Sequence, residues 1–525
     1  MFEVQQRLVD LRDSSGNGRP LYERVAQELA EAIRLGELKP GERLPSVRQL
    51  ATDAGLSVTT VMSVYALLAD NGLVRGEAGR GTFVSEQPKP ADGPPSPMAP
   101  SPGPGLAAPA RRAPTQRSPA RQSSTWRRMI LAQTEARLIQ SFPEAADIMR
   151  GSPDPDLLPL EAIRDAMSEV SSSLRPRDLE YPSTLSVEPE LAQALQARLA
   201  VDELPADSGD MLVGNSTQQF LSLLAVLLRQ RFPDEPVLVG IEEPGYQTAM
   251  DTLELHGLGL IPINLDPYGA TAEGLRAALE SGAAAVFLTP RAQSPTGCSW
   301  TVERRQALAD VLASYPEVWI VEDDHFAEAS ASRPGSLYND ARLQERVVYL
   351  RSFSKSIAPD LRLSVAIARP QIRHSLLMAK SFADGWTSRI SQRVLAAVLS
   401  DPRTDDALYR ARTEYTRRRA SLRDAILDVS DAHRLGVTVG EVGPDGLHIW
   451  VTLPRGCGAD RVVEAAARDG FLLAAGQPFF VTPGNQRHLR LNAGAVAPEA
   501  AHKVAAVIGD AVTHVLDQPT ALLTP

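Results

Sequence analysis

The sequence predicts a multidomain chain, in which a small, mainly helical domain ending in a β hairpin precedes a larger α/β domain with a largely parallel sheet. Residues 1–85 combine helix-period apolar residues with a glycine-rich hairpin, and residues 125–525 alternate helical segments with short β runs. Between them, residues 86–124 are rich in proline. At 525 residues the chain also exceeds the size of one ordinary core.

Composition narrows the class of protein. Hydrophobic residues make up 43% of the chain and charged residues 22%, as in soluble globular proteins. The net charge of −10 argues against a protein whose whole surface binds a polyanion such as nucleic acid. Two cysteines, Cys298 and Cys457, provide neither a disulfide framework nor a zinc site. The longest apolar stretch, 220–228, is too short to span a bilayer, and the N-terminus lacks an apolar signal core. We therefore expect a cytoplasmic protein with no metal site and no membrane segment.

The N-terminal region contains three helical segments and a hairpin. Apolar residues recur at every fourth position over 21–33, and shorter amphipathic segments follow at 46–54 and 58–70, with Gly55 between them. Two helices joined by a tight turn form a helix-turn-helix unit, which places the start of its second helix in a DNA major groove. Two β runs flank a glycine-rich tip at 76–81, as in a wing. A small helical packing module is the alternative interpretation.

Charge counting limits how this domain could bind DNA. Residues 1–85 hold ten Lys or Arg and eleven Asp or Glu, so the domain as a whole is not basic. Binding would depend on a local basic face, in a dimer that doubles the weak binding energy of one half-site. The arginines available for that face are Arg43, Arg48, Arg75 and Arg80.

A flexible linker is predicted over residues 86–124, which contain eleven prolines and almost no large apolar side chains. Such a segment cannot bury enough surface to fold and is typical of polyproline II spacers. Extended at about 3.1 Å per residue, it would reach on the order of 120 Å. Its cationic end fits either a solvated tail or an extra contact to DNA phosphate.

The larger region shows the alternation of an α/β domain. Residues that carry chemistry follow its β runs directly, at 289–297, at 322–325 and at 352–355. Because ligands bind beyond the carboxyl ends of parallel strands, we expect these residues around one pocket. The predicted β runs are 237–241, 284–288, 318–321 and 347–350.

Lys355 is the residue around which this pocket is expected to form. It lies in a serine-rich loop after the run that ends at Leu350, and Arg362 follows seven residues later. A lysine amine forms a Schiff base with an aldehyde once it is neutral, and burial beside another cation lowers its pKa from about 10.4 toward working pH. Arginine and small hydroxyls suit a phosphate. Taken alone, the stretch is more typical of a lysine on a solvated surface, and the other segments decide between the two interpretations.

Longer motifs show which families the two domains resemble. The strings at 36–51, 72–74 and 79–84 resemble the winged-helix domain of GntR-type transcription regulators. The larger domain is similar to the fold-type I aminotransferase scaffold that binds pyridoxal 5′-phosphate (PLP), on the strength of Asp323, Lys355, Arg362, Pro295-Thr296-Gly297 and Glu243-Pro244-Gly245-Tyr246. In this order and joined by a long linker, the two domains resemble the MocR (GabR-like) subfamily of GntR regulators over nearly the whole chain.

The resemblance implies a set of DNA-binding residues. Val58 stands where the family commonly has a cation in its recognition helix, although a valine can still contact a thymine methyl group. The residues expected to meet phosphates and base edges are Arg43, Arg48, Ser57, Thr59, Thr60, Arg80 and Gly81.

The resemblance also implies roles around a bound PLP. Lys355 would form the Schiff base, and Asp323 would pair with the pyridine nitrogen and keep it protonated. Tyr246 would stack on the ring, and Arg490 would bind a substrate carboxylate. Each of these three residues also has a purely structural alternative. Asp323 could cap a helix, Tyr246 could be a core residue, and Arg490 could form an ion pair or lie on the surface. The other cofactor-binding residues implied are Arg362, Ser352, Ser354, Ser216, Thr217, Gln218, His325 and Gln293.

Several positions depart from the family pattern. His325 stands where tyrosine is usual, Arg291-Ala292 where Ser-His is usual, and both Ser216 and Arg351 where glycine is usual. We expect these changes to cluster where the effector and the 3′ side of the ring bind. They therefore leave the identity of the effector open.

The favoured interpretation is a PLP-dependent transcription regulator whose aminotransferase-like domain senses PLP, or an amine or amino acid that reacts with it. Its partners would be a double-stranded DNA operator and a second copy of the chain, arranged head-to-tail by family resemblance. The alternative is an active aminotransferase with an accessory DNA-binding arm. A third interpretation is an empty aminotransferase fold that serves only for dimerisation.

Overall fold

The computed structural model describes residues 134–517 except 183–186, 234, 441, 442, 444 and 483–486. In the N-terminal region it describes 25, 26, 28, 29, 32, 33, 37–39, 41–53, 61, 64, 65, 68, 74–77 and 81–84, without the side chains of 47, 48, 52, 75–77 and 81. The chain forms two compact units, Met1–Ala113 and Pro114–Pro525. The domain boundaries expected at either end of the linker remain predictions.

The first unit has the helices that the apolar periodicity predicts. The described positions within 25–33 and 61–68 are helical, and α3 spans Val47–Asp53. The amide of Gln49 donates to Ser46 Oγ at 3.2 Å, as an N-cap requires. The apolar side chains from these helices meet in one core that includes Val25, Leu29, Leu50, Val61, Val64 and Leu68.

A β hairpin completes this unit. β1 (Val74–Glu77) pairs antiparallel with β2 (Gly81–Val84), with Val74 opposite Val84. The segment before α3 lies along the hairpin, because Leu44 N donates to Thr82 O at 2.8 Å and Arg43 forms a β-bridge with Phe83. Both hairpin valines are buried with the helices. The winged helix-turn-helix prediction is confirmed.

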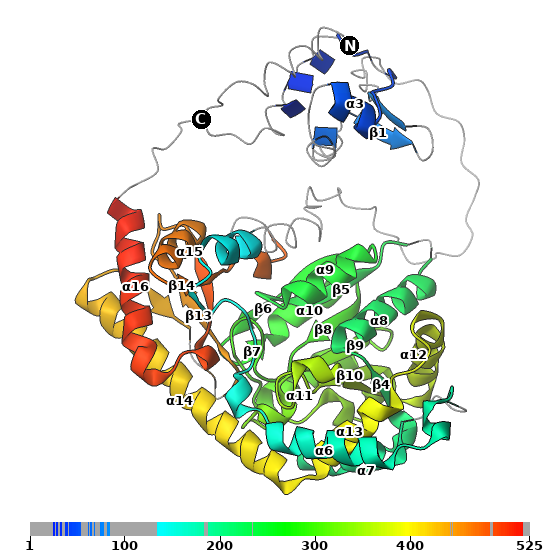
Figure 1. Cartoon of the computed structure of the whole chain (residues 1–525). Coiled ribbons are helices and arrows are strands. Elements are labelled where there is room, and N and C mark those ends of the chain that lie inside the picture. The colour runs from blue at the N-terminus through cyan, green and yellow to red at the C-terminus, as the bar shows by residue number, and fades with distance from the viewer. Residues whose placement is uncertain are drawn as a thin grey trace. The chain divides into compact units, whose positions relative to one another are not determined.

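The second unit is organised around an eight-stranded sheet in the order β4-β11-β10-β9-β8-β5-β6-β7 (Figure 1). Strands β10, β9, β8, β5 and β6 pair in parallel. β11 pairs antiparallel with both β10 and β4, and β7 pairs antiparallel with β6. The largely parallel sheet predicted from the sequence is confirmed. The strands are β4 (Met211–Gly214), β5 (Leu238–Glu243), β6 (Gly259–Asp266), β7 (Gly269–Ala270), β8 (Ala283–Leu288), β9 (Trp319–Asp324), β10 (Val347–Ser352) and β11 (Ser364–Ala368).

Helices cover both faces of this sheet. α8 (Thr217–Arg231), α9 (Gln247–Leu255) and α12 (Pro370–Ala383) share one core with side chains such as Val321, Val348 and Leu350. The opposite face, with Ile320, Val347 and Tyr349, packs against a second core. Successive strand residues point to opposite faces, so β9 and β10 contribute to both cores. The helices on the second face are α6 (Leu160–Ser173), α7 (Pro189–Val201), α10 (Ala272–Glu280), α11 (Val302–Ala313) and α13 (Arg389–Ser400).

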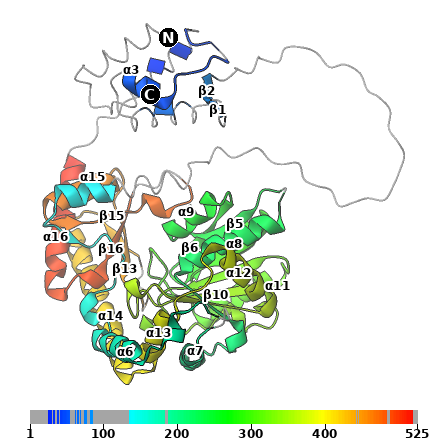
Figure 2. The same cartoon turned by 45° about the vertical axis from the view of Figure 1, so that its right-hand side comes forward.

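A smaller antiparallel sheet forms the other part of this unit, in the order β12-β13-β16-β15. It packs with α15 and α16 on one side of the unit, and the large sheet lies on the other (Figure 2). A parallel pair, β3 with β14, lies beside it. The elements are β3 (Ala146–Asp147), β12 (Thr438–Val439), β13 (His448–Thr452), α15 (Ala459–Arg468), β14 (Phe471–Leu472), β15 (Ala474–Ala475), β16 (His488–Asn492) and α16 (Pro498–Asp517).

One long helix, α14 (Pro402–Ala432), connects the two parts (Figure 1). Near its start, Arg403 forms an ion pair with Asp165 of α6 at 2.8 Å. Near its end, Leu422 and Ile426 are buried in the core of the small sheet. Among the helices of the described residues, none has both the length and the apolarity needed to cross a membrane.

Candidate functional site

A cavity of about 420 Å³ lies at the carboxyl ends of β9 and β10. Gln293 does not line it, because its buried amide donates to Pro244 O at 2.9 Å and to Glu242 Oε2 at 3.2 Å. The other residues implied for the cofactor and substrate all lie on the cavity wall: Ser216, Thr217, Gln218, Tyr246, Asp323, His325, Ser352, Ser354, Lys355, Arg362 and Arg490. The sequence therefore predicted which residues meet, and their individual roles remain predictions.

Lys355 follows β10 and reaches across the cavity. Its Nζ donates a hydrogen bond to the carbonyl oxygen of Gly151, a residue distant in the chain. Burial, and then the charge of Arg490, lowers the lysine pKa to about 8. A lysine with this pKa has a substantial neutral fraction near neutral pH, which a nucleophilic amine requires.

Asp323 lies in β9 and is almost fully buried. Its Oδ1 has no hydrogen-bond partner within the described part of the chain. Burial, and then the charges of Asp324 and Glu242, raises its pKa to about 7. A buried carboxyl group without a donor is costly, so this oxygen is suited to a ligand that brings a cationic N–H.

The other end of the cavity is suited to an anion. Ser216 caps α8 by accepting from Gln219 N at 3.1 Å, and Thr217 and Gln218 form the first turn of that helix. The amides at a helix N-terminus favour a negatively charged group. Arg362 also lines this cavity and has a left-handed backbone, with φ of 52°. A non-glycine residue in this conformation is strained, which is common at ligand sites.

His325 and Tyr246 line the wall near Lys355. Burial, and then the charge of Lys355, lowers the pKa of His325 to about 4, so its imidazole is neutral at pH 7. Burial raises the pKa of Tyr246, whose hydroxyl therefore keeps its proton. Both residues can exchange neutral hydrogen bonds with a ligand.

Arg490 comes from β16 of the small sheet. Its Nη2 donates to Met149 O at 2.5 Å, and its guanidinium stacks over the ring of Phe479 at 4.7 Å. Its Nε has no partner within the described residues. Burial lowers the pKa of Arg490 to about 10, so the side chain remains charged and can bind an anion from the cavity.

A buried ion network lies on the opposite face of the large sheet. Arg291 binds Asp324 at 2.9 Å and Asp202 at 3.0 Å. Arg351 binds Asp202 and also Glu328, the latter at 3.1 Å. Burial would raise the pKa of Asp324, but the charges of Arg291 and Arg351 lower it to about 2.

This network corrects one expectation from the sequence. Arg291 and Arg351 were expected beside the effector and the cofactor ring, but neither lines the cavity. For Arg351 the reason is strand alternation, which turns Ser352 toward the cavity and Arg351 toward Tyr349 OH, 2.8 Å away. Arg291 is instead held by Asp324 and Asp202. Of the other departures, Ser216 and His325 line the cavity, and Ala292 does not.

Comparison with known proteins identifies the family. Residues 151–508 match the family described as Aminotransferase class I and II, and residues 21–84 match the bacterial regulatory proteins of the gntR family. The vitamin B6 salvage pathway transcriptional repressor PtsJ of Salmonella typhimurium is 27% identical over 87% of this chain and 92% of its own length. The probable rhizopine catabolism regulatory protein MocR of Rhizobium meliloti is 27% identical over 76% of each chain.

The chain belongs to the class I and II aminotransferase family, as a MocR-type transcription regulator. A crystal structure of kynurenine aminotransferase from Pyrococcus horikoshii, in complex with PMP, superposes on it with a TM-score of 0.64 and 25% sequence identity. That similarity covers 74% of this chain and 94% of the other. The MocR-type regulator therefore combines a DNA-binding domain with an aminotransferase-like domain.

Gly151 and His448 are among the residues of the regulator's cavity that sequence reasoning missed. Gly151 bonds Lys355 from a position 204 residues earlier, so no local pattern could connect them. His448 begins an otherwise apolar strand, His-Ile-Trp-Val-Thr, in a region without a recognised motif. A polar residue within such a run is the signal that could have identified it.

Most of the expected DNA-binding residues of the regulator lie outside the described residues. This holds for Ser57, Thr59, Thr60 and Arg80, and for the side chain of Arg48. Arg43 is exposed next to the hairpin, and Gly81 is the first residue of β2. The local basic face therefore remains a prediction.

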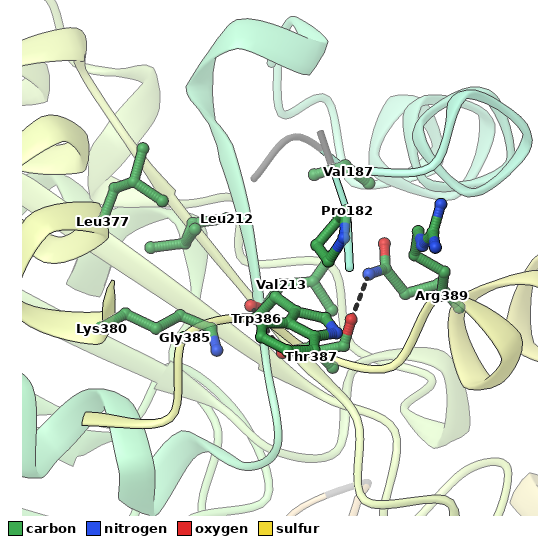
Figure 3. A pocket seen from close by; sticks show the side chains of 11 residues that line it. Pro182, Val187, Leu212, Val213, Leu377, Lys380, Gly385, Trp386, Thr387 and Arg389 are labelled. Carbon is green, nitrogen blue, oxygen red and sulfur yellow. Dashed lines mark hydrogen bonds between the residues drawn. The ribbon is translucent and has the colours of Figure 1, made fainter. Parts of the chain in front are cut away.

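A second pocket, between β4, α12 and the start of α13, is too small for a cofactor (Figure 3). Its volume is about 20 Å³, room for about one water molecule. Its buried Lys380 pairs with Asp384 at 2.8 Å, so this lysine is not available as a nucleophile. Lys355 is therefore the better candidate for Schiff-base chemistry.

The ion network predicts a large effect on stability. Replacing Arg351 by alanine leaves Asp202 and Glu328 buried without one of their cations. We expect Arg351→Ala to lower the free energy of unfolding by about 3–5 kcal/mol, measured by urea denaturation followed by tryptophan fluorescence.

Arg342→Ala provides the matched control, because Arg342 is itself exposed and its ion pairs with Asp310 and Asp340 should contribute little.

The contribution of the network to stability should also depend on pH. The folded-state pKa of Asp324, about 2, lies below its unfolded value of about 3.9, so the stabilisation is present above pH ~4 and is lost as pH falls toward 2. Equal stability of the two variants at pH 7 would contradict the assignment.

Proposed function

We propose that this MocR-type regulator binds PLP at Lys355, and that an amine or amino acid reacting there controls how the winged helices hold operator DNA. One cavity carries the proposal, because it brings together three groups that PLP requires. Lys355, with its lowered pKa, suits the aldehyde, and Asp323 Oδ1, which has no partner among the described residues, suits the pyridine nitrogen. The N-terminus of α8 suits the phosphate.

The residues present fit PLP at each end of the cavity. Asp323 Oδ1 has no donor among the described residues, and a protonated pyridine nitrogen beside it would supply the missing N–H and lower its raised pKa. The α8 N-terminus, Ser352, Ser354 and Arg362 offer amides, hydroxyls and a guanidinium to a phosphate. Bound PLP would supply an aldehyde that condenses with amines and a ring that withdraws electrons.

Lys355 would hold the cofactor and could also move a proton. With a pKa of about 8, roughly a quarter of its amine is neutral at pH 7.5. His325 would donate or accept at the ring edge as a neutral imidazole. Arg490 would orient an effector that carries a carboxylate.

A second copy of the chain would complete the regulator. Trp386 lines the pocket of Figure 3 and contacts Tyr181 edge-to-face with ring centroids 5.2 Å apart, and both side chains are exposed. Exposed apolar side chains of this kind are typical of protein interfaces. The exposed apolar side chains in this region are Leu179, Tyr181, Met378, Phe382 and Trp386. They support a homodimer, which would place two winged helices on one operator.

Thermodynamic linkage explains how effector binding would be coupled to DNA binding. An effector changes DNA binding only if it binds two arrangements of the dimer with unequal affinity, and DNA then changes effector binding by the same factor. A working aminotransferase with a DNA-binding arm is the second candidate, favoured by the similarity to kynurenine aminotransferase. A third, an empty fold used only for dimerisation, predicts that PLP does not bind.

Replacement of the lysine tests cofactor binding. Lys355→Ala should abolish the visible absorbance that PLP acquires when attached to the protein, because no other lysine lines the cavity within the described residues. Lys503→Ala, a change at an exposed lysine of α16, should retain it. Full absorbance in Lys355→Ala would refute the assignment, and no absorbance in the wild type would favour the empty fold.

A titration separates sensor from enzyme. Amines and amino acids are added to the PLP-loaded protein, with the visible spectrum and keto-product formation followed together. We expect a spectral change with less than one product molecule per site, because sensing needs only exchange of the amine on the cofactor. Product accumulating over many turnovers would establish the aminotransferase instead.

The DNA contact is tested through salt dependence. Arg48→Ala should weaken operator binding and reduce the slope of log affinity against log salt concentration by roughly one, because one phosphate contact is lost. Arg455→Ala, at an exposed arginine of the second unit, serves as the control. Identical salt slopes for Arg48→Ala and wild type would exclude Arg48 from the interface.

A further inference from the structure

We propose that His448 is a specificity-determining residue of the effector site, which binds the effector's carboxylate together with Arg490. The regulator would then respond to amino acids rather than to simple amines, a choice that the proposed function leaves open. The inference rests on that proposed function, because it presumes PLP at Lys355.

Strand geometry places the two side chains on one face of the small sheet. His448 of β13 lies opposite Asn492 of β16, and Arg490 is two residues from Asn492 on the same strand. Residues two apart on a strand point to the same face, as do residues directly opposite each other. Both His448 and Arg490 line the cavity that contains Lys355.

Gly151 marks the point at which these side chains converge. A Cβ atom on this glycine would lie 2.7 Å from His448 Nε2 and 3.9 Å from Arg490 Nη1. The carbonyl oxygen of the same glycine accepts the hydrogen bond from Lys355. A histidine, an arginine and the reactive lysine therefore approach one backbone position at the cavity wall.

Two nitrogens of this group have no partner. His448 Nε2 and Arg490 Nε are both buried and make no hydrogen bond to any described residue. Arg490 uses Nη2 for Met149 O, which leaves its other donors for a ligand. Buried polar groups without partners destabilise a site unless a ligand satisfies them, and a carboxylate presents two acceptor oxygens to two donors.

The charges around His448 favour an anion. Burial, and then the charges of Arg490 and Lys355, lowers the pKa of His448 well below its usual range, so its ring is neutral. The nearby carboxylate Glu135 is bound to Arg150 at 2.6 Å, and Asp147 lies 3.5 Å from the same arginine. In its Nε2–H tautomer, the neutral histidine donates beside a charged guanidinium and suits a carboxylate, whereas an amine that lacks a carboxylate leaves both nitrogens unpaired.

Matched ligand pairs test this inference in the PLP-loaded full chain. Each pair is an amino acid and its decarboxylated amine: alanine with ethylamine, leucine with 3-methylbutylamine, and phenylalanine with 2-phenylethylamine. The half-saturating concentration is read from the visible spectrum of the bound cofactor. We expect His448→Ala to raise it about 10-fold or more for the amino acids, and less than twofold for the amines.

Two further variants keep the test independent of folding defects. His448→Gln retains an N–H donor and should recover most of the amino acid response. His448→Glu places a negative charge next to Arg490 and should reverse the preference in favour of amines. His502→Ala, at an exposed residue of α16, should match the wild type for every ligand.

The outcomes separate this inference from the proposed function. Equal effects of His448→Ala on both members of a pair, or no effect on the amino acids, would overturn the role of His448. Loss of PLP binding in both His448→Ala and His448→Gln would assign the histidine to the cofactor and overturn it as well. A wild-type protein that never acquires the visible absorbance would overturn the proposed function itself.

Discussion

The alternation of side chains along β9 and β10 is the constraint on which the candidate site depends. Asp323 and Asp324 are neighbours, yet one faces the cavity and the other faces the ion network on the far side of the sheet. Asp324 is held in its charged form by two arginines, while one oxygen of Asp323 has no hydrogen-bond partner among the residues that the structure describes. A single strand thus carries one carboxylate that fixes the structure and one that remains available to a ligand.

The ion network holds the ends of these strands in place. Arg291 follows β8, Asp324 ends β9 and Arg351 lies in β10, so the network ties the ends of three adjacent strands together. Asp202, after α7, connects both arginines to the helical layer. Loss of one member of such a buried network lowers the free energy of unfolding, because the remaining charges have no water to solvate them. Lys355 and Asp323 are therefore carried by strand ends with little freedom to shift.

Local pattern predicted the residues that follow strands, and failed where contacts join distant parts of the chain. Asp323 and Lys355 were found because they closely follow hydrophobic runs, and Arg362 because it follows Lys355 by seven residues. β6 was missed because it contains Pro262, which the structure accommodates since β7 pairs only with the last two residues of that strand. The Asp202–Arg351 and Gly151–Lys355 contacts, 149 and 204 residues apart, arise only when the fold is complete.

The cavity wall is divided between the large sheet and the small sheet. Asp323 and Lys355 belong to the large sheet, Arg490 and His448 belong to the small one, and α14 is embedded in the latter while its start reaches α6. At 31 residues this helix is about 46 Å long. A molecule that contacts both walls would therefore bridge the same two parts of the unit that this helix connects.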